Sequence, residues 1–284
     1  MVSPFRLHQQ HVRGLKSGAA VRNATVTPLE PEKNTPEGRE YAALRVLLHA
    51  NLRAISDVAS IEARNPMKAE FAKSFAPWIE GVLAAGKLGN ASQDEILTTN
   101  LIWAVDYRDF DYALRLAAHA IRFNLVLPER YKRTIPCFLA EDIADQALAM
   151  KDSVSLEQLL TVLRLIDGAD MNDIVKARLH KAIGRGWARK AEAFDPTADN
   201  APAGGKAAYL TQALAHIERA YALDKNAGVK DDIKTLRRQL TKLAKEAEAT
   251  GGAPKAPGGT SEQEDLDNDA DDDAEDTSDE PPAT

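Results

Sequence analysis

Apolar residues recur three or four positions apart along most of residues 37–249, and this spacing predicts amphipathic helices. The first helix is expected to begin at Thr35, because a threonine cap followed by proline and then glutamate is a typical helix start. Its apolar stripe is predicted to contain Tyr41, Leu44, Leu48, Leu52, Ile55 and Ile61.

A second helix is predicted to start at Pro66 and to end at Gly86 and Gly89, since glycine is common where helices stop. Pro77 falls inside this pattern, and a proline there indicates a kink or a break. The stripe on either side of it consists of Phe71, Phe75, Trp78, Ile79 and Val82.

A third helix is expected to start at Ser92, because Ser92 and Glu95 have the spacing of a capping box. This helix carries Trp103, and a short glycine-containing loop joins it to the helix of Trp78. We therefore expect the two tryptophans to pack in one core, with a sharp turn between two antiparallel helices.

The remaining pattern predicts a helix over 112–123 with Asp109 as its cap. Further helices are expected over 137–151, 155–167, 171–194, 206–223 and 227–248. Two stretches, RDFDYALRLAAHAI and YLTQALAHIERAY, align small residues that let helices approach closely, as in tetratricopeptide hairpins. The predicted fold is all-α, built from antiparallel helix hairpins with local tetratricopeptide-like packing.

Composition and charge suggest four segments along the chain. Residues 1–36 are expected to form a flexible basic arm, 37–128 an N-terminal helical domain with the Trp78/Trp103 core, and 129–249 C-terminal helical hairpins. Residues 250–284 are expected to be a disordered acidic tail, because glycine, proline and acidic residues leave no apolar face to bury. The tail holds 12 Asp and Glu, and it either engages a basic partner, mimics DNA or keeps the chain soluble.

Several function classes find no support in the sequence. The chain has one cysteine, which fits a reducing cytosol, and no apolar run of about 18 residues that would span a membrane. No phosphate-binding loop is present, so no nucleotide cofactor is expected. His8 and His11 lack neighbouring ligands, and no metal site is assigned.

The cluster Asp106, Asp109 and Asp111 is the best candidate for a metal-dependent nuclease, which needs converging carboxylates. A capping role for Asp109 and solvated turn positions for its neighbours are the stronger interpretation. Asp142 and Asp145, on a later helix, add little support for a nuclease. No catalytic residues are assigned.

Three basic groups are candidates for contacts with DNA phosphates, which supply much of the affinity of DNA-binding proteins. One lies in the N-terminal arm, one surrounds Tyr131 between two prolines, and one shares a face of the helix over 171–194. The candidate DNA-binding residues are Arg6, Arg13, Lys16, Arg22, Arg130, Lys132, Arg133, Arg178, Lys181 and Arg185.

The middle of the chain contains an ordered series of motifs: PW-x-x-GVL-x-x-GK from Pro77, QD-x-IL from Gln93, Trp103, D-x-x-x-AL-x-x-A-x-x-AI from Asp109, and LP-x-x-x-x-RT-x-P from Leu127. In this series the chain resembles the small terminase subunit of contractile-tailed temperate phages with cohesive-ended genomes. Weaker similarity continues through ARLHKAIG and ALAHIERAYALD-x-x-AGVK, and the whole covers roughly residues 24–240.

The resemblance implies a protein of the host cytoplasm that binds viral double-stranded DNA at the packaging site. It implies further that the protein recruits or regulates a large ATPase–nuclease subunit and forms a homo-oligomer, commonly a ring. The family is also credited with endonuclease activity, which we expect from the assembled terminase. No helix-turn-helix signature is found, so the element that enters a DNA groove is unassigned.

Two alternatives stay open at this point. In the first alternative, the chain is a tetratricopeptide-like scaffold that binds only protein. In the second, it is an endonuclease in its own right that directs cohesive-end cleavage.

Overall fold

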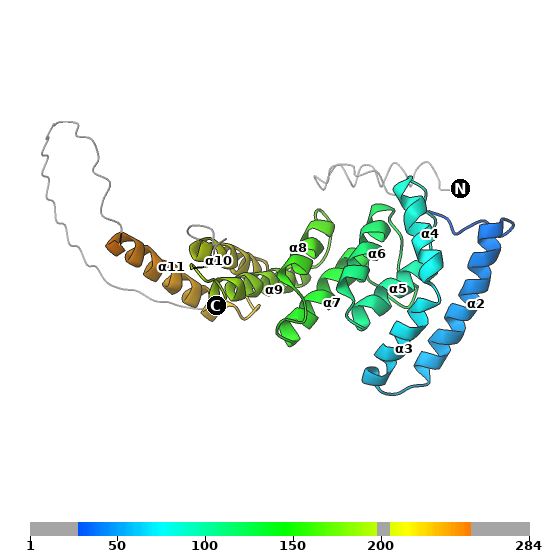
Figure 1. Cartoon of the computed structure of the whole chain (residues 1–284), viewed down its shortest axis with the longest axis horizontal. Coiled ribbons are helices and arrows are strands. Elements are labelled where there is room, and N and C mark those ends of the chain that lie inside the picture. Colours follow the sequence, from blue (N-terminus) through cyan, green and yellow to red (C-terminus); the bar gives the residue numbers. More distant parts are fainter. Residues whose placement is uncertain (1–27, 198–204, 251–284) are drawn as a thin grey trace, which may run out of the picture. The chain divides into compact units, whose positions relative to one another are not determined.

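The computed structural model describes residues 28–197 and 205–250. Helices are the only regular elements in these two ranges, which confirms the predicted all-α fold. Figure 1 labels them in chain order as α2 Pro36–Ser56, α3 Ile61–Lys73, α4 Ala76–Lys87, α5 Glu95–Asp106, α6 Phe110–Arg122, α7 Ile135–Ala149, α8 Leu156–Leu165, α9 Asp173–Glu192, α10 Gly205–Leu223 and α11 Lys230–Thr250.

The contacts divide the chain into one unit of residues 1–244 and a second of 245–284. Of the second unit the structure describes only residues 245–250, the end of α11. The predicted arm and acidic tail lie almost wholly outside the described residues. The predicted boundaries at 128 and 249 stay predictions.

Capping residues set most of the helix starts. Thr35 accepts a hydrogen bond from the backbone N–H of Gly38, and Asp109 accepts one from that of Tyr112, as the sequence predicts. Ser155 and Gln158 form a reciprocal capping box at the start of α8. These bonds satisfy backbone donors that the first helical turn leaves without partners.

The predicted start of the second helix at Pro66 is wrong. Ser60 caps α3, Pro66 lies inside the helix, and Ile61 is exposed instead of belonging to the first apolar stripe. The predicted break near Pro77 is confirmed, because α3 ends at Lys73 and Pro77 occupies the first turn of α4. Proline is tolerated in a first turn, where its missing N–H would have no helical partner.

The predicted cap at Ser92 is also wrong, because Asp94 caps α5. The Asp94 carboxylate accepts hydrogen bonds from the Leu97 backbone N–H at 2.9 Å and from the Trp78 indole N–H at 2.7 Å. Asp94 is 2% exposed, and this burial raises the pKa of its carboxyl against the opposing effect of these donors. One buried side chain therefore joins the start of α5 to α4.

A glycine inside α4 marks a close contact rather than a helix end. A Cβ added to Gly86 would lie 2.4 Å from the Nδ1 atom of His119 on α6, and α4 continues to Lys87. The chain turns at Gly89, which has a positive φ of 90°, and this confirms the glycine predicted at the end of the helix.

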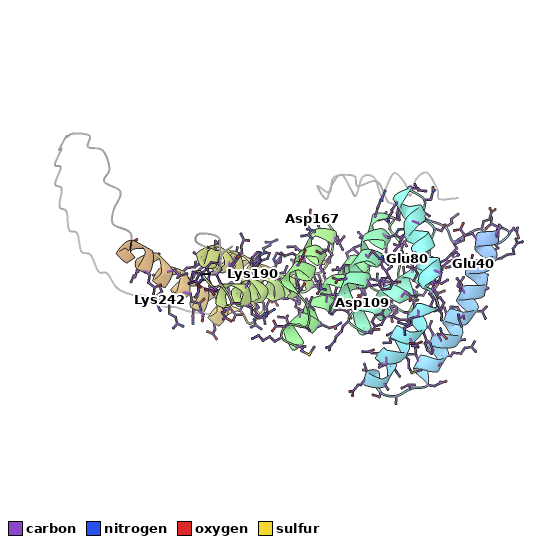
Figure 2. The ribbon with its side chains drawn as sticks, viewed as in Figure 1. Glu40, Glu80, Asp109, Asp167, Lys190 and Lys242 are labelled. Atoms are coloured by element: carbon purple, nitrogen blue, oxygen red, sulfur yellow. The ribbon has the colours of Figure 1, made fainter. Side chains whose placement is uncertain are left out.

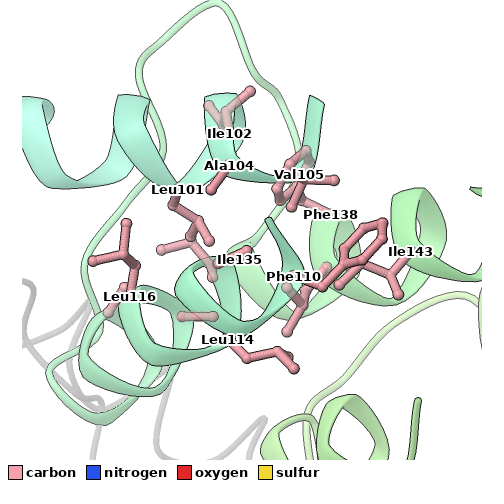
Figure 3. Packing of buried hydrophobic residues seen from close by; sticks show 14 of the residues in the cluster. Leu101, Ile102, Ala104, Val105, Phe110, Leu114, Leu116, Ile135, Phe138 and Ile143 are labelled. Carbon is pink, nitrogen blue, oxygen red and sulfur yellow. The ribbon is translucent and has the colours of Figure 1, made fainter. Parts of the chain in front are cut away.

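A first core cluster joins buried residues of α2 to α9 (residues 41–183). Its centre is α5, whose residues from Ile96 to Val105 are all buried, and Trp103 is among them while Trp78 packs against the cluster. Figure 3 shows side chains of α5, α6 and α7 gathered there, including Leu101, Val105, Phe110, Leu116, Ile135, Phe138 and Ile143.

A second, smaller cluster lies among α9, α10 and α11 and contains Ala191, Leu210, Ala213, Ile217, Val229 and Leu236. Small residues bring α9 and α10 together, as the alignment of alanines predicts. A Cβ added to Gly184 would lie 2.6 Å from the Cγ1 atom of Ile217 and 3.1 Å from the carbonyl oxygen of Ala213.

Candidate nucleic-acid interface

Charge is distributed unevenly over the described residues. Residues 28–172 hold 16 Lys and Arg against 21 Asp and Glu, whereas residues 173–197 and 205–250 hold 15 against 9. Helices α9 to α11 therefore form a basic region, and the helices before them an acidic one. A local excess of positive charge is the electrostatic footprint expected where a protein contacts phosphates.

Helix α11 separates apolar and basic residues onto two faces. Leu236 is buried in the second cluster, and Ile233, Leu240 and Leu243 pack against it. The solvent face carries cations four residues apart, and all four are exposed: Lys230, Lys234, Arg238 and Lys242. We call these four residues the α11 basic stripe.

Figure 2 labels Lys242 at one end of this stripe. Sequence reasoning missed the stripe, although the four-residue spacing of its cations is visible in the sequence and places them on one helix face. Adjacent cations are about 6 Å apart along the helix axis, given its rise per residue.

Within the α11 basic stripe, Lys234 forms a weak pair with an acidic residue. The Lys234 Nζ atom lies 3.9 Å from the Asp231 carboxylate, and both side chains are largely exposed. Such surface pairs contribute little. The neighbouring Arg237 is bound to Glu218 of α10 at 2.6 Å and lies outside the stripe.

An aromatic ring holds two lysines beside the start of α11. The Nζ atoms of Lys225 and Lys230 lie 4.2 and 5.8 Å from the centre of the Tyr221 ring. The π face of a tyrosine attracts cations. Tyr221 therefore offsets part of the repulsion between the two ammonium groups and keeps positive charge concentrated at this corner.

The predicted basic loop presents two of its three cations to solvent. Arg130 and Lys132 are exposed, and the guanidinium of Arg130 lies 5.1 Å from the centre of the Tyr131 ring. Arg133 instead binds Glu141 at 2.7 Å and Asp142 at 2.8 Å, which neutralises its charge within the protein. Burial raises the pKa of the Asp142 carboxyl, and the Arg133 cation opposes this shift.

The structure brings Arg178, Lys181 and Arg185 onto one side of α9, but each has a partner within the chain. Arg178 binds Asp145 at 3.2 Å, Lys181 donates to the Ala227 carbonyl oxygen at 2.7 Å, and Arg185 binds Asp232 at 3.0 Å. Burial also lowers the pKa of the Lys181 ammonium.

These bonds tie α9 to α7 and to the start of α11, so the role of the three cations toward DNA stays a prediction. The arm candidates Arg6, Arg13, Lys16 and Arg22 lie outside the described residues, as do His8 and His11.

The acids considered for catalysis do not converge on one point. Asp106 binds Lys68 at 2.8 Å, Asp109 caps α6, and Asp111 accepts from the side-chain amide of Gln158 at 2.9 Å. Within residues 28–197 and 205–250, no group of three or more His, Cys, Asp or Glu is arranged to hold a metal ion.

Two histidines meet between α9 and α10. The Nδ1 atoms of His180 and His216 are 2.9 Å apart, so one neutral ring donates to the other. Burial lowers the pKa of both imidazoles, and the neighbouring His216 and Arg219 contribute to lowering that of His180 to about 4. The contact needs an unprotonated Nδ1 on one of the two rings, so protonation of both would break it.

Over residues 28–197 and 205–250, the fold and charge distribution define an all-α protein whose helices α9 to α11 are basic and carry an exposed cationic stripe. None of the helices over 28–197 and 205–250 is long and apolar enough to cross a membrane. Comparison with known proteins assigns the chain to a family within this class. The chain belongs to the phage small terminase subunit family, whose family model matches residues 45–174.

Two relatives are similar to this protein over most of the chain. The terminase, endonuclease subunit of Escherichia phage P2 is 34% identical over 84% of this chain and 86% of its own length. The probable terminase, endonuclease subunit of Haemophilus phage HP1 is 24% identical over 90% of this chain and 91% of its own. No solved structure gives a significant match.

Proposed function

We propose that the protein is the DNA-recognition subunit of a phage terminase, which binds viral double-stranded DNA at the cohesive-end packaging site. The observation that carries the proposal is the α11 basic stripe within a region of net positive charge, in a chain of the small terminase family. Neutralising phosphates releases counterions from DNA, and this release drives binding.

The contacts that the proposal requires are made to the DNA backbone. The α11 basic stripe and the pair Arg130 and Lys132 provide exposed cations, and the arm residues Arg6, Arg13, Lys16 and Arg22 add four more by sequence. Backbone contacts position a protein on DNA but read no bases. Specificity for the packaging site therefore requires further contacts, or several copies that bind neighbouring sites together.

The salt dependence of DNA binding tests the proposal. Full-length protein is titrated against a cohesive-end duplex between 50 and 200 mM salt, and the slope of log K against log salt is measured. Lys234→Ala and Arg238→Ala should each reduce the slope by about 0.9. Lys151→Ala, which removes an exposed cation from the acidic region, is the matched control and should leave the slope unchanged.

Two results would count against this function. If the protein does not bind the duplex at low salt, the protein-binding scaffold becomes the better hypothesis. If binding is normal but the slopes of the α11 variants equal that of the parent, the DNA contact lies elsewhere.

The second part of the proposal is that the subunit recruits or regulates the large ATPase–nuclease subunit and acts as a homo-oligomer in the host cytoplasm. Family membership supports this part. Co-purification of the two subunits, with and without DNA, tests it, and a small subunit that never associates with the large one would refute it.

An intrinsic endonuclease is the second candidate, because both relatives are named endonuclease subunits. Purified protein with magnesium or manganese should then nick a cohesive-end duplex. Replacing Asp106, Asp109 and Asp111 together by asparagine should abolish nicking if these carboxylates act. Nicking that survives this replacement would assign the activity to other residues.

A further inference from the structure

The outer face of α2 is apolar and exposed. Tyr41, Leu48 and Ile55 are buried on the side of α2 that packs in the first core cluster. On the opposite side, Val46 is 71% and Leu47 41% exposed. Exposed alanines continue this surface along the helix at positions Ala43, Ala50 and Ala54.

Opposite charges stand at the two ends of this face. Arg39 and Asp57 are both exposed, and neither has an ion pair within residues 28–197 and 205–250. They are 18 residues apart, which corresponds to about five helical turns, so they point in the same direction about 27 Å from each other. Ala43, Val46 and Ala50 lie between them along the same line.

This arrangement is self-complementary when two copies of α2 run antiparallel. A two-fold axis at the level of Leu48 sets Arg39 of one copy opposite Asp57 of the other, because both are nine residues from that level. Val46 then lies opposite Ala50, and the stem of Arg53 covers Ala43. A parallel pairing would instead bring like charges together at both ends.

We propose that the outer face of α2, defined by Arg39, Ala43, Val46, Ala50 and Asp57, is a self-association surface that pairs two copies of this chain antiparallel. The alanines let the two helices approach closely, and the pairing removes Val46 and Leu47 from water. Figure 2 labels Glu40 beside the Arg39 end of this surface.

The size of the surface sets the strength of the pairing. One helix face about 27 Å long and about 10 Å wide covers less than the roughly 800 Å² per partner typical of stable interfaces. The dimer is therefore weak on its own and depends on protein concentration. The pairing is two-fold, so a closed ring would need a second contact surface.

The inference rests on the self-association included in the proposed function but not on DNA binding. Two copies joined through α2 bring two α11 basic stripes to one DNA molecule, and a linked second site strengthens binding without any new contact. The decisive experiments contain no DNA, so their failure would leave the DNA-binding proposal standing.

Charge complementation tests the surface. Sedimentation of the full-length protein is measured over a range of concentrations for Arg39→Asp and Asp57→Arg. Each variant alone places like charges opposite each other at both ends of the pair and should dimerise at least tenfold more weakly than the parent. An equimolar mixture of the two restores opposite charges at both ends and should dimerise as well as the parent.

The control is Lys151→Asp, which carries the same change of charge as Arg39→Asp away from α2 and should dimerise normally. A parent that stays monomeric at the highest concentration overturns the proposal. A mixture that behaves like the separate variants overturns it as well, and then the outer face of α2 belongs to another occupant, such as a different segment of this chain.

Cysteine cross-linking tests the direction of the pairing. In a Cys137→Ser background, Arg39→Cys and Asp57→Cys proteins should form a disulfide-linked dimer only when mixed. Antiparallel pairing keeps identical cysteines about 27 Å apart. Cross-linking of Arg39→Cys protein with itself at the same rate would show a parallel or random encounter and refute the antiparallel arrangement.

Discussion

The region of residues 28–172 and the region of α9 to α11 use charge in different ways. In the first, acids outnumber bases 21 to 16, and a large apolar core fixes α2 to α8. In the second, bases outnumber acids 15 to 9 around a small core. Net positive charge works against compactness through self-repulsion. Its concentration where the core is small therefore favours a binding role for that charge.

Truncation of the two cores gives the largest expected difference between the regions. Phe138→Ala removes a ring that is 2% exposed at the centre of the first cluster, and should lower the free energy of unfolding by about 3–5 kcal/mol. Ile217→Ala in the smaller cluster should cost about 2–3 kcal/mol, because fewer neighbours lose contacts. Urea unfolding followed by circular dichroism measures both. A larger loss for Ile217→Ala would contradict the comparison.

The Asp94 cap is the next most sensitive position and belongs to the first region. Asp94→Ala removes the cap of α5 and leaves the indole N–H of Trp78 without its partner, at a combined cost of about 2–3 kcal/mol. Ser92→Ala is the matched control and should change stability by less than about 0.5 kcal/mol. Equal losses of stability in both variants would instead favour Ser92 as the cap of α5. Thermal unfolding distinguishes the two results.

Acid should weaken the second region through the His180–His216 contact. The unfolded chain takes up protons near the ordinary histidine pKa of about 6.5, whereas burial keeps the pKa of folded His180 near 4. Stability is therefore complete above about pH 6.5 and falls as the pH drops toward 4. Solvent screening at these partly exposed rings limits the loss to about 2 kcal/mol.

Unfolding measured at several pH values, with the double variant His180→Gln/His216→Gln as reference, tests this expectation. The variant should lose the part of the pH dependence that the two rings cause. Parallel pH profiles for parent and variant would show that the pair does not titrate in this range.

Glycine replacement gives the smallest effects and opposite signs in the two regions. Gly184→Ala forces a Cβ against Ile217 and the Ala213 carbonyl oxygen, and should destabilise the α9–α10 contact by about 1–2 kcal/mol. Gly81→Ala on α4 meets no atom within 4 Å and should stabilise the protein by about 0.5–1 kcal/mol through its helix propensity. The melting temperatures of the two variants and the parent measure both effects. A stabilising Gly184→Ala would show that α9 and α10 are loosely packed.

The sequence predicts helices better than it predicts their partners. Local signals placed the caps Thr35 and Asp109 and the turn at Gly89, because capping and a positive φ depend on residues next to each other. The cap at Asp94 is not predicted, although its bond from Leu97 is local, because Ser92 and Glu95 match the spacing of a capping box. The second bond of Asp94, from Trp78 on another helix, leaves no local signal.

The candidate interface shows the same limit. Helical spacing places Arg178, Lys181 and Arg185 on one face. The sequence around each cation does not show that it is bound, in this order, by Asp145, the Ala227 carbonyl oxygen and Asp232. Ion pairs between distant segments form only after the chain has folded, so a cation that is free in the sequence can be neutralised in the structure.

Helix α9 has a mechanical consequence for any event on the basic region. Val175, Leu179 and Ile183 belong to the first core cluster and Ala191 to the second, and one uninterrupted helix of 20 residues carries them all. Such a helix is a rod about 30 Å long without a hinge. A force that a bound molecule applies to α10 or α11 would therefore displace α9 as one rigid element. The displacement would be transmitted to α7 and α8 without being lost by bending within α9.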